Sequence, residues 1–505
     1  MLATLLLVAC AQSLDEIEST LKAANDKTSY ENGAYSAARS LADMRTEDAQ
    51  KLRIELFDTK HDTYRGVYLR DWFYSGYLKS TSHSEGDLML AAAANKKNSS
   101  WHRVILLRGI ERSKVKVSGK LLLSKNFLKD ADVCRAWQHC AGVLLKESRI
   151  DFSDSKTASS DKLMELFDKA GAPFHGYAYL DSLTGKQQAN LADAALKGKD
   201  SGDRAIAIRV LTQQAPANLN LLSIAQSAFD NNAAGPRTAV LESVVDNEIF
   251  IAAPLLIKFL KDEVAAFPDL PSRFVSDIGD SLRKLTGIAF GNDPAMWEKW
   301  WNEAGAGWLA EAKKDSTNDD QQERQQDETV AQFFGIPIDS SNVAILVDGS
   351  GSMSTSQLNG ESCAEAAATE VGKFLAQLPK KALFTVATIE QKPEFGFKKM
   401  VANSKTNRKK ALDFLAKRPY RSTSALYDAL EQVALDASID TVLIVSDGGS
   451  SAGKHQYPGH ILDGFERMYL RTGLRIHCVL VTDSNKHEGF LRDLAAVSGG
   501  RMVKP

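Results

Sequence analysis

The chain has few cysteines, no excess of either charge and no common nucleotide-binding motif, and each absence narrows its function. Its 5 cysteines include no Cys-x-x-Cys pair, which excludes the usual zinc and redox motifs of that spacing. A formal net charge of −2 provides no basic field over the whole chain for nucleic acid. Without a Gly-x-x-x-x-Gly-Lys-Ser/Thr motif, the chain itself is not a P-loop ATPase. Its 505 residues, 44% of them hydrophobic, predict roughly two to four domains with sizeable cores.

The apolar run at the start, residues 1–11, is far too short to span a bilayer and is typical of a truncated export signal. Its last residues before Ala11, Leu-Val-Ala-Cys, resemble a bacterial lipobox, in which Cys10 is lipidated and becomes the mature N-terminus. Cleavage by ordinary signal peptidase after Ala9 or Ala11 is the alternative. Because no Lys or Arg precedes the apolar core, the true start could lie upstream, or the run could be a buried helix of a cytosolic protein. We expect an exported protein, in the periplasm, anchored to the outer membrane or extracellular.

Four further cysteines fit an exported protein without requiring it. Cys134 and Cys140 are six residues apart, too far for one helical face. Export would allow a disulfide between them, and reduced thiols are equally compatible with the sequence. Cys363 and Cys478 fall in an expected helix and an expected strand, where we predict buried thiols.

Composition and periodicity divide the rest of the chain into four parts. Residues 12–150 are charged and mixed, and we expect a mostly helical region. Residues 151–310 contain consecutive short amphipathic helices with polar or Gly/Pro joints, which are similar to HEAT-like repeats. Residues 311–332 are polar and predict a solvated linker or exposed helix, with relative motion of the parts on either side. Residues 333–505 alternate short apolar strands with helices.

Three stretches of the helical part have more than one interpretation. Val104–Leu107 and Val115–Leu123 are apolar runs that we interpret as strands, or as a strand followed by a helix. Residues 58–77 interleave aromatic residues with arginines, which can bind nucleic acid. We expect these aromatic residues instead to pack a helical domain, since the chain lacks a basic balance.

Trp297, Trp300 and Trp301 lie at positions i, i+3 and i+4, which share one face of a helix. An exposed stripe of this kind could bind carbohydrate or a membrane. We expect a capping helix packed on the last repeat, because this spacing is typical of core-facing positions.

The strongest functional signal is a strand that ends in alternating polar residues. Val343–Val347 is apolar and rich in β-branched residues, which predicts a buried parallel strand. Asp348, Ser350 and Ser352 follow at alternate positions, separated by glycines that allow a tight turn. The carboxyl end of such a strand is where open α/β sheets bind ligands. One carboxylate and two hydroxyls are hard oxygen donors suited to Mg²⁺ or Mn²⁺ and poor for zinc.

Two later motifs strengthen this interpretation. The hydroxyl cluster Ser422–Ser424 precedes a helical run, and a second apolar strand at 441–445 ends in Ser446, Asp447 and two glycines. With these motifs in this order, residues 333–505 resemble the von Willebrand factor A domain with its metal-ion-dependent adhesion site. The resemblance covers about a third of the chain and implies a doubly wound, mostly parallel α/β sheet.

By this resemblance the metal ligands are Asp348, Ser350, Ser352 and Asp447 together with a third hydroxyl. The family's Thr falls on Ser424 here, with Thr423, one position earlier, as the substitute. The serines and the third hydroxyl would bind Mg²⁺, or Mn²⁺ or Ca²⁺, directly, while the two aspartates hold waters or replace them.

A site whose direct ligands are mostly neutral leaves net positive charge on the ion, which favours a carboxylate from a partner protein. The motifs contain no His, Lys or Cys base, so we expect binding and no enzymatic activity.

The whole chain is therefore predicted to be a multidomain protein, with an all-α, HEAT-like region followed by a doubly wound α/β domain. Its predicted function is divalent-metal-dependent protein binding on an exported bacterial protein. Two alternatives remain open: a cytosolic partner module for a separate AAA-type ATPase, and a scaffold whose metal only stabilises the fold.

Overall fold

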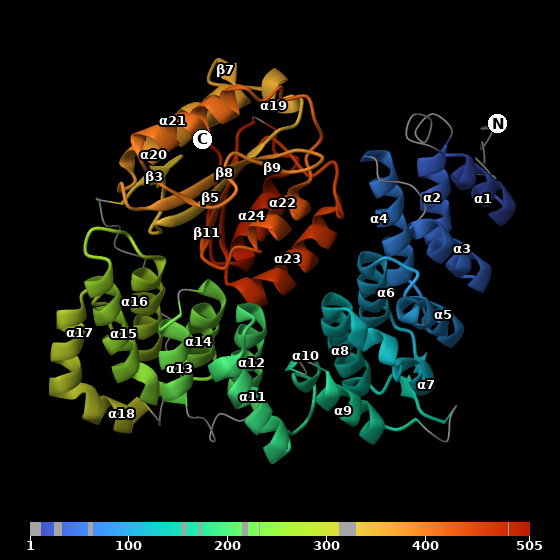
Figure 1. The fold of residues 1–505 in the computed structure, drawn as a ribbon, viewed down its shortest axis with the longest axis horizontal. Coiled ribbons are helices and arrows are strands. Elements are labelled where there is room, and N and C mark those ends of the chain that lie inside the picture. The colour runs from blue at the N-terminus through green and yellow to red at the C-terminus, as the bar shows by residue number, and fades with distance from the viewer. Residues whose placement is uncertain are drawn as a thin grey trace, which may run out of the picture. The chain divides into compact units, whose positions relative to one another are not determined.

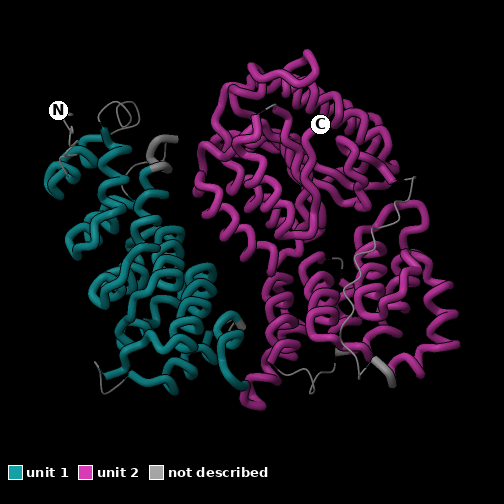
Figure 2. The backbone as a smooth tube through the Cα atoms, turned by 180° about the vertical axis from the view of Figure 1, so that it is seen from behind, with its two compact units in different colours: residues 1–182 teal, residues 183–505 magenta. Residues whose placement is uncertain are grey.

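The computed structural model describes residues 12–24, 33–58, 64–153, 158–170, 174–214, 221–231, 233–312, 330–482 and 484–505. The chain forms two compact units, residues 1–182 and residues 183–505 (Figure 2). The expected signal segment 1–11, including Cys10, and residues 313–329 of the polar segment lie outside the described residues.

The first unit is built from short helices (Figure 1). They are α1 (Leu14–Ala23), α2 (Ala34–Asp43), α3 (Glu47–Phe57), α4 (Tyr64–Leu78), α5 (His83–Ala94), α6 (Ser100–Arg112), α7 (Gly119–Leu122), η1 (Lys125–Lys129), α8 (Ala131–Lys146), α9 (Ser160–Lys169) and α10 (Phe174–Tyr177). Two short strands, β1 (Val117–Ser118) and β2 (Ile150–Asp151), pair in parallel. The strand expected at Val104–Leu107 is wrong, because these residues belong to α6 and are buried on more than one side of it. A short apolar run that is buried on all sides does not distinguish a strand from a helix.

The aromatic residues that end α4 pack inside this unit, as expected: Phe73, Tyr74 and Tyr77 are all buried. Cys134 and Cys140 are reduced thiols buried in α8, so they do not form the disulfide that export would allow. None of the helices in the described ranges combines the length and the apolar character needed to cross a membrane.

The second unit begins with another run of helices, as the amphipathic pattern of this region predicts. They are α11 (Gly185–Lys197), α12 (Ser201–Gln214), α13 (Leu221–Phe229), α14 (Ala234–Asp246), η3 (Phe250–Ala252), α15 (Ala253–Ala266), α16 (Arg273–Thr286), α17 (Pro294–Trp300), η4 (Trp301–Gly305) and α18 (Ala306–Ala312). The similarity of this region to HEAT repeats stays a prediction.

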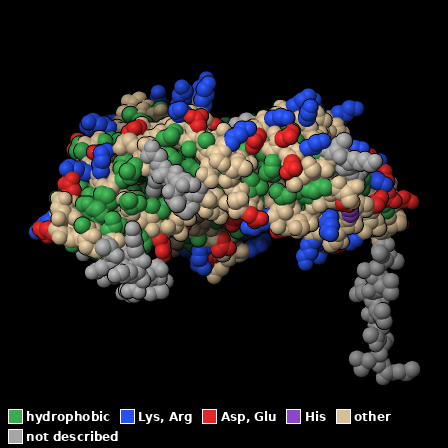
Figure 3. Space-filling view, turned by 90° about the horizontal axis from the view of Figure 1, so that it is seen from below, with side chains coloured by type: hydrophobic (Ala, Val, Ile, Leu, Met, Phe, Trp, Pro, Cys, Tyr) green, Lys and Arg blue, Asp and Glu red, His purple; other side chains and the backbone are tan. Residues whose placement is uncertain are grey.

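The tryptophans at the end of this run lie neither on a fully exposed stripe nor wholly in the core. Trp297 is completely buried, whereas Trp300 and Trp301 are half-buried. Trp308 of α18 packs edge-on against both, with ring centroids 5.5 Å and 6.3 Å away. Hydrophobic side chains gather over this end of the second unit (Figure 3). Ile251 of η3, which precedes α15, is exposed as well.

The rest of the second unit is an α/β domain around one main sheet. Its strands are β5 (Asn342–Asp348), β8 (Leu383–Ile389), β9 (Glu394–Phe395), β10 (Val401–Ala402), β11 (Thr441–Ser446), β12 (Arg475–Leu480) and β13 (Met502–Val503). Their order is β10-β8-β5-β11-β12-β13, and β9 pairs with β8. The pairs from β8 to β13 are parallel, and β9 and β10 are antiparallel additions at one side. The predicted doubly wound, mostly parallel sheet agrees with this arrangement.

Helices cover both faces of the sheet (Figure 1). They are α19 (Ser352–Thr355), α20 (Cys363–Gln377), α21 (Lys405–Ala416), α22 (Leu426–Val433), α23 (Pro458–Thr472) and α24 (Glu488–Val497). Short antiparallel pairs lie outside the main sheet: β3 (Gln332–Phe333) with β4 (Ile336–Pro337), and β6 (Gln357–Leu358) with β7 (Glu361–Ser362). After β5 the chain continues to β8 on one side and later returns to β11 on the other. In open α/β sheets such a change of direction marks the place where ligands bind, which here is the carboxyl end of β5.

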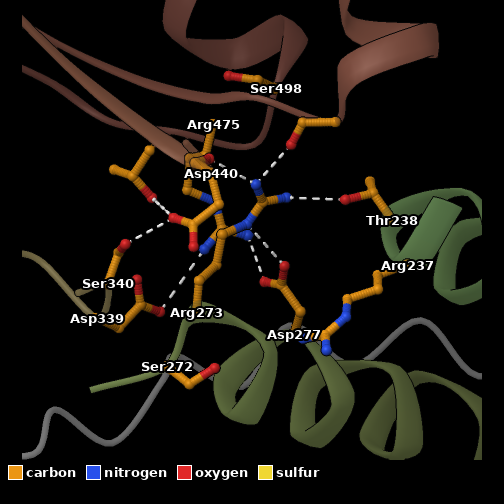
Figure 4. Close-up of polar contacts among 12 residues, drawn as sticks. Arg237, Thr238, Ser272, Arg273, Asp277, Asp339, Ser340, Asp440, Arg475 and Ser498 are labelled. Carbon is orange, nitrogen blue, oxygen red and sulfur yellow. Dashed lines mark hydrogen bonds and ion pairs between the residues drawn. The ribbon is translucent and has the colours of Figure 1, made fainter. Parts of the chain in front are cut away.

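A buried polar network joins the helices of the second unit to the opposite, amino end of the sheet (Figure 4). Arg273 of α16 donates to the carbonyl oxygen of Asp440, which precedes β11, at 2.8 Å, and to Asp277 Oδ2 at 2.9 Å. Arg475, the first residue of β12, forms an ion pair with Asp277 and another with Asp339, the latter at 3.6 Å. Both arginines are buried, so their charges depend on these partners.

A second group of contacts flanks this network. Arg471 of α23 pairs with Asp203 at 2.5 Å and with Asp200 at 2.9 Å, both near the start of α12. Gly235 allows α14 to approach α23 closely, because a Cβ at this position would lie 2.1 Å from the Arg471 carbonyl oxygen. The helical region 185–312 and the α/β domain therefore share an extensive polar interface within one compact unit.

Candidate metal centre

Asp348, the last residue of β5, is held in place from two directions. Its Oδ1 accepts a hydrogen bond from the Ser350 backbone N–H at 2.9 Å, which fixes the turn that follows the strand. Its Oδ2 accepts from Ser446 Oγ, at the end of the neighbouring strand β11, at 2.6 Å. The carboxylate is only 1% exposed. Asp348 therefore lies between the two strand ends, with both oxygens already oriented.

The hydroxyls of the metal loop form a chain that reaches the end of β11. Ser350 Oγ and Ser352 Oγ are 3.0 Å apart, and Ser352 Oγ donates to Asp447 Oδ1 at 3.0 Å. Four of the predicted ligand residues are therefore connected in one cluster. Ser356 joins the cluster as well, since its Oγ donates to Asp447 Oδ2 at 3.3 Å. Ser356 lies outside the Asp-x-Ser-x-Ser motif. Its spacing of four residues from Ser352 was the signal in the sequence that could have identified it.

The electrostatics of the cluster favour a cation. Burial raises the pKa of Asp348 to about 6, and the neighbouring Asp447 carboxylate acts in the same direction. The hydrogen bonds from Ser446 and Ser350 oppose this shift without cancelling it. A divalent ion beside two carboxylates would stabilise their ionised forms.

The hydroxyl cluster Ser422–Ser424 lies beside the loop that carries Asp348, Ser350 and Ser352. The Gly351 N–H donates to the Ser422 carbonyl oxygen at 3.2 Å, and the Ser422 N–H donates to the Gly349 carbonyl oxygen at 3.3 Å. These two bonds make Ser350 and Ser422 partners in an isolated parallel bridge. The segment that contains the candidate third hydroxyl therefore runs directly beside the metal loop.

The two candidates for that hydroxyl differ in their surroundings. The Ser424 backbone is tied to another loop, since its carbonyl oxygen accepts from the N–H groups of Ser451 and Ala452 at 2.8 Å and 2.9 Å. The Thr423 hydroxyl is buried and has no hydrogen-bond partner among the residues that the structure describes. A buried hydroxyl without a partner is costly, and a metal ion would satisfy it. The choice between Ser424, on which the family spacing places the third hydroxyl, and Thr423 stays a prediction.

His487 is a neighbour of the site that no sequence motif indicated. It precedes α24 and covers the two glycines after Asp447, because a Cβ on Gly449 would lie 2.8 Å from its imidazole ring. Burial lowers the pKa of His487, the charge of Lys486 acts in the same direction, and Asp447 opposes both. Since His487 lies 40 residues after Asp447 in the sequence, only the tertiary structure reveals this contact.

The donor set fits a hard divalent cation. The cluster of Asp348, Ser350, Ser352 and Asp447, with a third hydroxyl from Ser424 or Thr423, supplies only oxygen, which Mg²⁺, Mn²⁺ and Ca²⁺ prefer. Two carboxylates and three neutral hydroxyls would leave part of the coordination shell to water or to an external ligand.

Comparison with known proteins identifies the family of the domain that contains this cluster. Residues 341–503 match the family described as the von Willebrand factor type A domain. A solved von Willebrand factor type A structure from Catenulispora acidiphila is 17% identical, with 34% of this chain and 40% of that chain covered and a TM-score of 0.28. An aerotolerance-related membrane protein from Bacteroides fragilis is 14% identical over 32% of this chain and 90% of that chain, with a TM-score of 0.27. The Deinococcus radiodurans RO (RSR) protein is 12% identical over 97% of this chain and 94% of that chain, with a TM-score of 0.20. No curated protein matches the chain.

Proposed function

Because residues 341–503 form a von Willebrand factor type A domain, we propose that this protein binds a partner protein through a divalent metal ion at the carboxyl ends of β5 and β11. The observation that carries the proposal is the connected cluster in which Ser352 Oγ lies 3.0 Å from both Ser350 Oγ and Asp447 Oδ1. Two loops that are 95 residues apart in sequence thus present their oxygens to one place.

Each residue of the cluster has a distinct proposed role. Ser350, Ser352 and a third hydroxyl, from Ser424 or Thr423, would bind Mg²⁺, or Mn²⁺ or Ca²⁺, as neutral ligands. Asp348 and Asp447 would hold coordinated water or bind the ion themselves. When bound, the metal supplies a positive centre for an Asp or Glu carboxylate of the partner. Because the three motifs contain no His, Lys or Cys base, we propose binding without catalysis.

We further propose that the protein is exported and that Cys10 is lipidated, on the evidence of residues 1–11. Labelling cells that express the full chain with radioactive palmitate tests this. We expect label on the wild type and none on Cys10→Ser. A cytosolic protein that retains residues 1–11 without label would overturn the proposal.

The metal proposal is tested by titration calorimetry of Mg²⁺ and Mn²⁺ into the full chain. We expect one binding site in the wild type and loss of binding in Asp348→Ala. Asp493→Ala is the matched control, because it removes an exposed carboxylate from α24 of the same domain. A wild type that binds neither ion, or an Asp348→Ala variant that binds as tightly as the control, would refute the site. A melting temperature for each variant separates loss of the site from loss of the fold.

A further inference from the structure

Lysine and arginine are concentrated in one segment of the α/β domain, residues 379–421. This segment contains twelve of them against three acidic residues, a net charge of +9, whereas the rest of the chain carries −11. The net charge of −2 for the whole chain therefore does not reveal that positive charge is concentrated in this segment. Ten of the twelve cationic side chains are exposed. We refer to these exposed Lys and Arg side chains of residues 379–421 as the basic edge.

The segment forms one side of the main sheet. β10 is the outermost strand there, and α21 packs beside it against α20 and β8. Ala411 and Leu415 bury the inner face of α21. The outer face of the helix therefore presents Lys405, Lys409 and Lys410 to solvent.

The protein itself neutralises little of this charge. Within the described part of the chain, the ion pairs of this segment are those of Arg418 with Glu390 and Glu394. Helix α21 begins with Lys405 and has no acidic residue in its first turn, although a helix N-terminus favours negative charge. Like charges at positions i and i+4, such as Lys405 and Lys409, repel one another. An external anionic surface would relieve this repulsion.

The basic edge extends to the candidate metal centre. Ser422 is bonded to Gly351 of the metal loop, and exposed Arg421 directly precedes it. The Arg421 Cα is 3.9 Å from the position that a Cβ on Gly351 would occupy. On the other side, the Gln391 N–H donates to Ser422 Oγ at 3.2 Å, and exposed Lys392 follows it. Exposed Lys417, which follows the last residue of α21, and Arg421 thus carry positive charge from the end of this helix to the rim of the metal loop.

We propose that the partner bound at the metal centre is an acidic protein whose carboxylates lie along the basic edge while one of them binds the ion. This inference rests on the proposed function. Nine of the ten exposed cations are lysines, which act as point charges and lack the planar fork by which arginine binds phosphate. The five aromatic side chains of the segment are buried or half-buried, so no stacking platform for single-stranded nucleic acid is presented. Clustered fixed charge of this kind accelerates the association of an oppositely charged partner.

The probe for this proposal is a fluorescent peptide of consecutive glutamates, with a glutamine peptide of equal length as the neutral control. Binding to the full chain is followed by fluorescence anisotropy with Mg²⁺ present. We expect Lys409→Glu/Lys410→Glu to weaken binding about tenfold, the order expected for two reversed surface charges. The control is Lys284→Glu/Lys299→Glu, which reverses two exposed helical lysines outside the basic edge. Raising NaCl from about 50 to about 300 mM should weaken wild-type binding more than binding of the double variant.

The outcomes separate this inference from the proposed function. Peptide binding that requires Mg²⁺ and Asp348 but is unchanged by Lys409→Glu/Lys410→Glu overturns the inference and leaves the metal site intact. Binding that requires the lysines but survives EDTA and Asp348→Ala overturns the proposed function, and with it the placement of the acidic partner at the metal. Tighter binding of single-stranded RNA or of phosphatidylglycerol vesicles through the same lysines also overturns the inference, because the partner would then not be a protein.

Discussion

Arg273 and Asp440 are 167 residues apart in the sequence, and the guanidinium of the first donates to the main-chain carbonyl oxygen of the second at 2.8 Å. This bond connects α16 to the amino end of β11, while the candidate metal centre lies at the carboxyl end of the same strand. The helical region 185–312 and the type A domain thus stabilise each other at a buried surface. This interface opposes the relative motion that the polar composition of residues 311–332 predicts.

We predict that Arg273→Met will destabilise the second unit by about 3–5 kcal/mol, the usual cost of breaking a buried charged network by removing one partner. The methionine would fill the space, but Asp277 and the Asp440 carbonyl would lose a donor at a buried position. Urea unfolding of the full chain, followed by circular dichroism, measures the loss. Arg283→Met, on the partly exposed side of the same helix, serves as the control and should cost less than about 1 kcal/mol. Equal losses of unfolding free energy in the two variants would show that the buried network contributes little to stability.

The same interface should make the protein acid-sensitive. Burial would raise the pKa of Asp277, but Arg475 and Arg273 outweigh it and hold that pKa below its ordinary value of 3.8. Because the folded pKa is the lower one, the ionised carboxylate stabilises the fold above about pH 4, and this contribution is lost as the pH falls through the folded pKa.

We therefore expect Asp277→Asn to melt lower than the wild type at neutral pH and to lose less stability on acidification from pH 5 to pH 3. Thermal unfolding across this range checks the prediction. Asp280→Asn on the same helix is the control and should follow the wild-type curve. A wild-type stability that does not fall faster than that of Asp277→Asn would contradict the prediction.

If the Thr423 hydroxyl binds the metal, Thr423→Val should affect stability and Mg²⁺ binding in opposite directions. Thr423→Val keeps the shape of the side chain and removes a buried hydroxyl that has no partner among the described residues. Without metal, we expect the variant to be as stable as the wild type or more stable by up to about 1 kcal/mol. With Mg²⁺, we expect it to bind the ion more weakly. Ser424→Ala is the comparison: if it alone weakens Mg²⁺ binding, the family spacing was the better guide to the third hydroxyl.

The tryptophans at the end of the helical region should differ in their importance for stability. Trp297 is fully buried and its Nε1 donates to the Gly291 carbonyl oxygen at 2.9 Å, so Trp297→Ala should cost about 3–5 kcal/mol. Trp301 is half-buried, and Trp301→Ala should cost clearly less. Chemical unfolding of both variants measures the difference. A larger loss from Trp301→Ala would mean that Trp301, not Trp297, anchors this end of the helical region.

Much of the type A domain follows from local sequence. The run Val343–Val347 is apolar at every position, and a strand buried on both faces of a parallel sheet requires this. Helix α20 begins at Cys363 because Ser362 and Glu365 form a capping box. The resemblance to the von Willebrand factor A domain predicted that the polar residues after β5 and β11 meet, and Ser352 Oγ lies 3.0 Å from Asp447 Oδ1.

The sequence by itself determined the alternation of strands and helices, the strand ends that carry Asp348 and Asp447, and the concentration of lysine in residues 379–421. These are local properties, set by the side-chain periodicity of each element and by the composition of short segments. The tertiary structure decided that the Thr423 hydroxyl has no hydrogen-bond partner among the described residues, that His487 covers Gly449, and that Arg273 joins the helices to the sheet. These features depend on contacts between residues far apart in the chain, whose pairing no local pattern specifies.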